Sequence, residues 1–177
     1  MADNDTRLQS LLDKQEITEL VHAFARAADR RDHDALRDLY HPDATDDHGA
    51  FFKGLAMEFI DQLPEIQSSM RILHHNVTTV NIRLEGDYAE GEIYALAYHQ
   101  VATDREPVDL MIGGRYLDQY AKRDGRWKFS ARTVVTDWAT LNDPSTVPLK
   151  HPMIDGSHLG QPGPSDPSNT FLRLFRQ

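Results

Sequence analysis

Residues 108–139 of the chain read "VDLMIGGRYLDQYAKRDGRWKFSARTVVTDWA", and this stretch decides the fold. Two runs rich in β-branched and aromatic residues, 108–121 and 126–139, flank the sequence "RDG" (123–125). Such runs are typical of β-strands, and an Asp-Gly pair between them is a strong signal for a hairpin turn. Because strands joined by a tight turn run antiparallel, the stretch predicts an antiparallel hairpin.

The preceding part of the chain repeats this pattern. "VTTVNIRL" (77–84) and "AEGEIYALAYHQV" (89–101) are two further strand-like runs, and "EGD" (85–87) is a turn signal between them. Four consecutive strands joined in this way form an antiparallel meander. Helical periodicity is found before residue 72, so helices precede the sheet, and the predicted fold class is α+β.

The longest predicted helix covers about residues 6–30. Its apolar residues recur at steps of three and four, which is the period of one helix face. We therefore expect them to form one buried stripe along the helix. The residues of this predicted stripe are Leu8, Leu11, Leu12, Leu20, Val21, Phe24 and Ala28.

Two shorter helices are expected to follow. Asp32 is a suitable N-cap for a helix over "HDALRDLY" (33–40), which Pro42 would terminate. "GLAMEFIDQLPEI" (54–66) predicts a third helix, broken or ended near Pro64.

Length and composition favour one globular domain followed by a tail. The chain has 177 residues, of which 40% are hydrophobic, enough for a single core. The domain is predicted to span residues 1–141. Six of the nine prolines fall in residues 142–177, which we expect to dock on the body or on a neighbouring subunit through "TFLRLF" (170–175). A frayed terminus is the alternative.

Charge and residue usage exclude several classes of partner. The net charge is −9 and the basic residues are scattered, which argues against nucleic acid or an anionic membrane as partner. The absence of cysteine excludes disulfides, thiolate nucleophiles and cysteine-ligated metals. No apolar run reaches the roughly 20 residues that span a bilayer. The N-terminus "MADNDTRLQS" is too polar for a signal peptide, so a cytoplasmic location is expected.

A histidine pair, His74 and His75, precedes the first strand-like run. Successive strand residues point to opposite faces, so the two histidines should not share one site. No third ligand at a suitable spacing is evident, and we expect no metal. An inward-facing imidazole needs a partner, for which Asp29 at the end of the long helix is the best candidate. Its carboxylate opposes the helix dipole there, and such unfavourable placements are tolerated more often at sites than elsewhere. Spacing alone, however, favours a solvated Asp29 that pairs loosely with neighbouring arginines.

The order of these segments resembles the SnoaL-like branch of the NTF2-like superfamily. The resemblance covers about residues 8 to 138, and its motifs are "HHNVTT", "IYALAYHQV", "GGRYLDQYAKRDGRWKFSARTVV" and "DW". It implies a cone-shaped α+β barrel in which three N-terminal helices pack on a strongly bent antiparallel sheet. This fold would enclose a deep, mostly apolar pocket.

The resemblance also implies site residues. Members such as scytalone dehydratase, bile-acid 7α-dehydratase and hexachlorocyclohexane dehydrochlorinase share an Asp–His dyad, whose positions here are Asp29 and His75 rather than His74. Arg132 and His99 fall at further catalytic positions. His75 would be the general base, with Asp29 fixing its tautomer, and no metal or organic cofactor is needed.

A second group of residues is expected to bind substrate. The paired tyrosines of scytalone dehydratase have no clear match in this chain, and Tyr40 or His48 could replace them. The tyrosines at strand spacing also suit core or interface packing, and His22 could equally be a half-buried structural histidine. The substrate-binding candidates are Tyr40, His48, Tyr98, Tyr116, His22 and Phe24.

The expected function is a cofactor-independent lyase. It would catalyse base-initiated elimination, of the dehydratase or dehydrohalogenase type, on a hydrophobic aromatic or polycyclic small molecule. The alternatives are a cofactor-free carbon–carbon lyase, such as one deformylating lignin-derived diaryl compounds, a double-bond isomerase, or a non-enzymatic small-molecule-binding module. The resemblance also implies a homo-oligomer, with dimer and trimer both open.

Overall fold

The computed structural model describes residues 4–142, 155–159 and 167–174. Two helices, two strands and a third helix occupy the described residues up to Ile66, and four long strands follow. The elements in chain order are α1 (Asn4–Arg30), α2 (His33–Leu39), β1 (Tyr40–Asp47), β2 (Lys53–Leu55), α3 (Ala56–Ile66), a 3₁₀ turn (Gln67–Ser69), β3 (Met70–Glu85), β4 (Tyr88–Val101), β5 (Val108–Arg123), β6 (Arg126–Leu141), β7 (His158–Leu159) and α4 (Pro167–Phe171).

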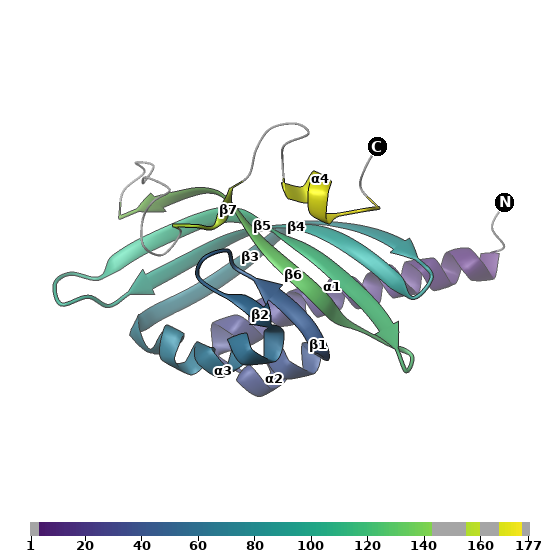
Figure 1. The fold of residues 1–177 in the computed structure, drawn as a ribbon, viewed down its shortest axis with the longest axis horizontal. Helices are drawn as coiled ribbons and strands as arrows, with labels where there is room; N and C mark the ends of the chain where they lie inside the picture. The colour runs from purple at the N-terminus through teal and green to yellow at the C-terminus, as the bar shows by residue number, and fades with distance from the viewer. Residues whose placement is uncertain (1–3, 143–154, 160–166, 175–177) are drawn as a thin grey trace.

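Within the described residues one curved sheet has the strand order β2-β1-β6-β5-β4-β3, with β7 added beside β6. Helices α1, α2 and α3 cover one face of this sheet, and α4 lies on the other face (Figure 1). We call the first face the inner face and the second the outer face. The α+β class and the packing of three helices on a bent sheet are confirmed, and the sheet is cone-like rather than a closed barrel.

The predicted meander is present in full. Strands β3 to β6 pair antiparallel in sequence order, with turns at Gly86 and at Asp124–Gly125. These three turn residues have positive φ angles of 60°, 53° and 74°, which the tight hairpins require. The expected antiparallel pairing holds for these four strands, whereas the complete sheet is mixed, because β1 and β7 pair with β6 in parallel. Strand β1 itself occupies residues for which the sequence predicted no strand.

Helix α1 is buried along only part of its length. Leu20, Val21 and Ala28 pack in the core as predicted, but the first turns extend past the edge of the sheet (Figure 1). The burial predicted for three leucines is therefore wrong, because no strand lies beneath them. Their exposed fractions are 56% for Leu8, 64% for Leu11 and 48% for Leu12.

Side-chain hydrogen bonds anchor α1 where its burial begins. Asp13 accepts hydrogen bonds from Lys122 Nζ at 2.8 Å and from Trp127 Nε1 at 2.9 Å. Burial acts to raise the pKa of Asp13, but these hydrogen bonds prevail and hold it below its usual value. The carboxylate thus ties the helix to the β5–β6 hairpin.

The two shorter helices follow the sequence closely. Asp32 is the N-cap of α2 and accepts a hydrogen bond from the backbone N–H of Ala35 at 3.0 Å. Helix α3 begins at Ala56, because Gly54 belongs to β2. It continues through Pro64 to Ile66 rather than breaking there. Its apolar face, buried against the rest of the core, holds the last turn in place despite the lost backbone hydrogen bond.

The described parts of the predicted tail lie on the body. Leu172 is fully buried on the outer face against Leu117 and Val135. The fully buried carboxylate of Glu90 accepts hydrogen bonds from the backbone N–H groups of Arg173, at 3.0 Å, and of the next residue. Residues 143–154, 160–166 and 175–177 of that tail are outside the described residues.

A second piece of the tail, residues 155–159, crosses the turn between β1 and β2. We call this segment the strap. The carbonyl of Gly156 accepts a hydrogen bond from the N–H of Ala50 at 3.0 Å. His158 Nε2 lies 3.1 Å from Asp47 Oδ1, and β7 pairs with β6. The strap therefore links β6 to the turn that follows β1.

Candidate functional site

A cavity of about 460 Å³ lies between the inner face of the sheet and helices α1 and α3. This volume suits a small organic ligand. Its wall is mostly apolar and aromatic, and Ser157 of the strap also contributes to it. The apolar wall is interrupted by Asp46, His48, His75 and His99, and the lining also includes Arg115 and the tyrosines Tyr40 and Tyr116.

Asp29 and His75 form a close pair at one side of the cavity. Asp29 Oδ1 lies 2.6 Å from His75 Nδ1, and the backbone N–H of His75 donates to both carboxylate oxygens, at 3.0 and 3.1 Å. The contact joins the last turn of α1 to β3. Hydrogen bonds from β3 thus offset the unfavourable position of a carboxylate at a helix C-terminus. With Nδ1–H donated to Asp29, Nε2 is the ring nitrogen that can accept a proton.

Strand alternation separates the two adjacent histidines, as the sequence predicts. His75 lines the cavity, whereas His74 is exposed on the other face of β3. The dyad geometry belongs to His75, and His74 lies outside the cavity.

His99 lies beside the dyad on β4. Its ring centroid is 5.6 Å from that of His75, and the side chain lines the cavity. Burial, with a smaller contribution from His75, lowers the pKa of His99 to about 4. Its Nδ1 is buried and has no hydrogen-bond partner among the described residues. Near neutral pH this ring is therefore an uncharged polar group.

Arg132 lies behind the cavity wall instead of on it. It is 1% exposed and makes a bidentate contact with Asp118, with Nε–Oδ1 at 2.7 Å and Nη2–Oδ2 at 2.9 Å. Its guanidinium carbon lies 3.9 Å from the ring centroid of Phe24 and 4.3 Å from that of Tyr116. The structure does not bring Arg132 to the dyad, because Asp118 and the aromatic rings enclose its charge.

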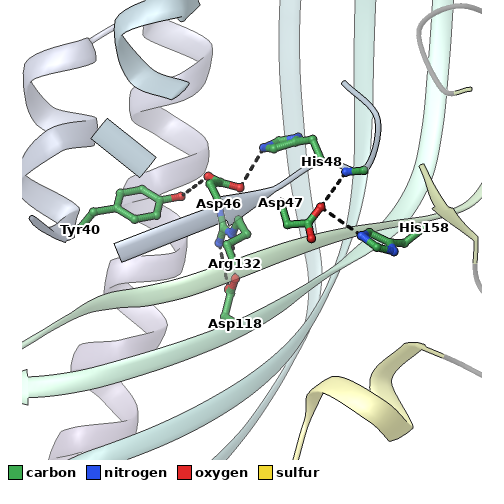
Figure 2. Close-up of polar contacts among 8 residues, drawn as sticks. Tyr40, Asp46, Asp47, His48, Asp118, Arg132 and His158 are labelled. Carbon is green, nitrogen blue, oxygen red and sulfur yellow. Dashed lines mark hydrogen bonds and ion pairs between the residues drawn. The ribbon is translucent and has the colours of Figure 1, made fainter. Parts of the chain in front are cut away.

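A second carboxylate–histidine contact was missed by sequence reasoning. Asp46 Oδ1 lies 3.0 Å from His48 Nε2, and Asp46 Oδ2 accepts a hydrogen bond from the Tyr40 hydroxyl at 3.3 Å (Figure 2). His48 was predicted as a cavity residue, but Asp46 was not. The only sequence feature that could have indicated Asp46 is the polar stretch "TDDH" (45–48), and its composition is not typical of a buried strand.

Residues 9–133 match the SnoaL-like domain family. The chain belongs to the SnoaL-like family. The uncharacterized protein Rv2910c of Mycobacterium tuberculosis is 25% identical to it over 122 residues, which are 68% of this chain and 82% of the relative.

Solved structures share the SnoaL-like fold of this chain. A hexachlorocyclohexane dehydrochlorinase, LinA type 2, superimposes with a TM-score of 0.72 at 19% identity, covering 89% of this chain and 99% of the other. A candidate scytalone dehydratase of Novosphingobium aromaticivorans has a TM-score of 0.68 at 21% identity, covering 78% and 93%. At these identities the likeness establishes the fold.

The predicted substrate-binding residues of the SnoaL-like domain divide into two groups. Phe24, Tyr40, His48 and Tyr116 line the cavity. Tyr98 does not, because its neighbours on β4 face inward and it therefore faces outward. His22 is also absent from the cavity wall.

His22 is exposed on α1 and lines a second pocket of about 520 Å³ together with Asp29, His74 and His75. His22 precedes Asp29 by seven residues, so the two lie on a similar side of the helix. Because Asp29 lies at the edge of the buried face, this spacing does not bring His22 to the cavity. In the part of the chain that the structure describes, no group of three or more His, Asp or Glu side chains could hold a metal ion. No described helix is long and apolar enough to span a membrane.

Proposed function

We propose that this SnoaL-like protein is a cofactor-independent lyase that uses the Asp29–His75 dyad for base-initiated elimination. The substrate would be a hydrophobic aromatic or polycyclic small molecule. The observation that carries the proposal is the 2.6 Å contact between Asp29 Oδ1 and His75 Nδ1 at the wall of an apolar cavity. An imidazole held in this way is oriented to accept a proton through its other nitrogen.

The elimination begins with a C–H bond of the substrate. His75 Nε2 takes the proton, and the C–H electron pair forms the new double bond. The leaving group departs with the electron pair of its own bond to carbon. Asp29 stabilises the imidazolium formed on His75, which then returns its proton to a departing hydroxide or to solvent. In a mostly apolar cavity, the attraction between carboxylate and imidazolium is stronger than in water.

The cavity and the comparisons support this reaction class. A cavity of about 460 Å³ with an aromatic wall suits a ring system with few polar groups. Two proteins of the same fold are named as a hexachlorocyclohexane dehydrochlorinase and a candidate scytalone dehydratase, and both names denote elimination.

The test is turnover by dyad variants. A panel of hydrophobic alcohols, halides and aryl compounds is incubated with the protein, and mass spectrometry detects loss of water or hydrogen halide. For any substrate converted, His75→Ala and Asp29→Asn should each lower kcat by about 10²- to 10⁴-fold, the usual contribution of a general base. His74→Ala, on the opposite strand face, is the matched control and should keep wild-type turnover.

The same assay distinguishes the other functions considered. Loss of formaldehyde would indicate carbon–carbon cleavage, and conversion without change of mass would indicate an isomerase. A binding module would take up ligand saturably and release no product. Wild-type turnover in both dyad variants would overturn the proposed role of Asp29 and His75.

A further inference from the structure

The Asp46–His48 pair forms a second polar site in the cavity wall. Asp46 is 2% exposed, and both residues line the cavity. Although Asp46 Oδ1 and His48 Nε2 are 3.0 Å apart, they are not aligned as a hydrogen bond, and neither atom has another partner among the described residues. The two atoms are close enough to form an ion pair when the His48 ring carries a proton on both nitrogens.

The two carboxylate–histidine pairs stand on different walls. His75 belongs to β3, which is at one end of the sheet order, whereas His48 directly follows β1, near the other end. Strands β6, β5 and β4 lie between β1 and β3. Both histidines line the same cavity, and they reach it from strands near opposite ends of the sheet order.

The His48 ring is fixed from several directions. It packs against Phe59 with centroids 4.3 Å apart, and its backbone N–H donates to the carbonyl of Phe52 at 2.8 Å. The adjacent Asp47 accepts a hydrogen bond from the N–H of Gly49 and contacts His158 of the strap (Figure 2). With Nε2 directed to Asp46, Nδ1 remains for a ligand, and no described residue forms a hydrogen bond with it.

An elimination that starts from a C–H bond needs a group that accepts the developing negative charge. A carbonyl next to that carbon is such a group if a proton donor meets its oxygen. His99 is less suited to this role, because no described carboxylate pairs with it to balance a positive charge and burial lowers its pKa to about 4. Arg132 is enclosed by Asp118 and the aromatic rings. Arg115 is paired with Glu92 and Asp137. His48 lines the cavity near the other end of the sheet order from His75, and the Asp46 carboxylate 3.0 Å from its Nε2 is in place to balance its positive form.

We propose that His48, positioned by Asp46, is the proton donor to a carbonyl oxygen of the substrate from which His75 removes a proton. This inference rests on the proposed function and names its substrate class: an apolar carbonyl compound with a leaving group β to the carbonyl. Asp46 is a positioning residue, because it acts through His48.

The step balances in protons and electrons. His75 removes the proton from the carbon next to the carbonyl, the C–H pair forms a carbon–carbon double bond, and the carbonyl oxygen takes a proton from the His48 imidazolium. The resulting enol then returns its O–H proton to His48 as the carbonyl reforms, and the bond to the leaving hydroxyl breaks. The His75 imidazolium protonates this hydroxyl, so one water is released and both histidines return to their starting states.

The test uses two probes that need no turnover: 4-nitrophenolate, whose oxygen carries the charge of an enolate, and 4-nitroanisole, its neutral methyl ether. Titrations followed by absorbance give the Kd of each. His48→Gln should weaken 4-nitrophenolate binding by about tenfold or more, the worth of one charge-assisted hydrogen bond. Asp46→Asn should weaken it in the same direction. Binding of 4-nitroanisole should stay within about twofold of wild type in both variants, which also shows that they fold.

Two controls locate the effect. His74→Gln, on the outer side of β3, should leave both probes unchanged, and His75→Gln should affect 4-nitrophenolate less than His48→Gln does. Equal weakening of both probes by His48→Gln would mean that the ring only fills space, and no weakening of either would mean that it does not donate. Both results overturn the proposal, as does a preference for the phenolate that depends on His75 alone.

Failure of the role proposed for His48 can be distinguished from failure of the proposed lyase function. If the dyad variants lose turnover while His48→Gln changes neither probe nor kcat, only the role of His48 fails. If the dyad variants keep turnover, the lyase proposal fails even where the probe preference is present. With a converted carbonyl substrate, His48→Gln should lower kcat with little change in KM, because the proton is donated as charge develops.

Discussion

At the scale of single residues, Arg132 shows how a site position can hold a structural group. It carries a charge in the centre of the domain, where a bidentate contact with Asp118 and the faces of Phe24 and Tyr116 enclose it. These aromatic rings form the cavity wall on their other side. Arg132 thus supports the wall and does not contact the ligand space directly.

The first prediction concerns this buried pair. Arg132→Met should lower the free energy of unfolding by about 3–5 kcal/mol, because it leaves the fully buried carboxylate of Asp118 without its cation. Urea denaturation measures the change. The double variant with Asp118→Leu should recover most of the loss, since two apolar side chains can replace a buried ion pair.

A matched control is available on the surface. Arg37 pairs with Asp61, and their side chains are 36% and 65% exposed. Arg37→Met should therefore cost at most about 1 kcal/mol. A stability loss in Arg132→Met no larger than that of Arg37→Met would contradict the structural role of the buried arginine.

The two histidine pairs differ in how far the sequence predicts them. Asp29 lies in the last turn of a clearly periodic helix and His75 lies in a clearly alternating strand, so local patterns and family order place both. Asp46 and His48 lie in and just after β1, whose polar sequence gives no strand signal. Strand β1 forms because it pairs with β6, whose partner residues lie more than 80 positions later in the sequence. A contact this distant in sequence is not visible in a local pattern.

At the scale of elements, the strap and the β1–β2 turn fit together through glycines. Gly49 has φ +69°, and a Cβ there would overlap the carbonyl oxygen of Gly156. Gly156 has φ +73°, and a Cβ there would overlap the side chain of Ala50. Both glycines therefore allow a positive φ angle and also the close contact between the strap and the β1–β2 turn. Because Ser157 and His48 line the cavity next to this contact, the fit shapes one part of the cavity wall.

The prediction for this element is that Gly49→Ala displaces the strap. The matched control is Gly86→Ala, since Gly86 has φ +60° but nothing lies within 4 Å of the added Cβ. Both variants should lose about 1–2 kcal/mol to the left-handed backbone conformation. Only Gly49→Ala should also accelerate proteolytic cleavage within residues 155–159. Mass spectrometry of the cleavage products measures this rate. Equal cleavage rates in the two variants would argue against close packing of the strap.

The other elements show where sequence patterns stop predicting. Helix period and turn residues predict α1 and the β3–β6 meander, because both depend on neighbouring residues. The exposure of Leu8, Leu11 and Leu12 depends on where the sheet ends, which is a tertiary property. The continuation of α3 through Pro64 likewise depends on the packing of its apolar face.

At the scale of the whole molecule, two exposed apolar surfaces stand out. One is the leucine ridge at the start of α1. The other lies on the outer face of the sheet, where Tyr94, Leu96 and Trp138 are 40%, 37% and 42% exposed. Leu96 and Trp138 both pair in register with Gly113, and a Cβ on Gly113 would overlap the indole ring. Leu96 and Trp138 are thus adjacent on a region of the outer face that α4 and Leu172 leave uncovered.

We expect the chain to form a homo-oligomer through this sheet surface, with dimer or trimer decided by the geometry of contact. Aromatic side chains on a sheet face supply large contact area at little entropic cost, whereas the leucine ridge is narrow and stands on a projecting helix. Trp138→Arg places a charge at the centre of the surface and should shift sedimentation to the monomer. Leu11→Arg, the same charge on the other surface, should leave assembly unchanged. If Leu11→Arg dissociates the oligomer and Trp138→Arg does not, the leucines at the start of α1 form the interface. If the wild-type chain sediments as a monomer at every concentration, neither apolar surface binds a second copy of the chain.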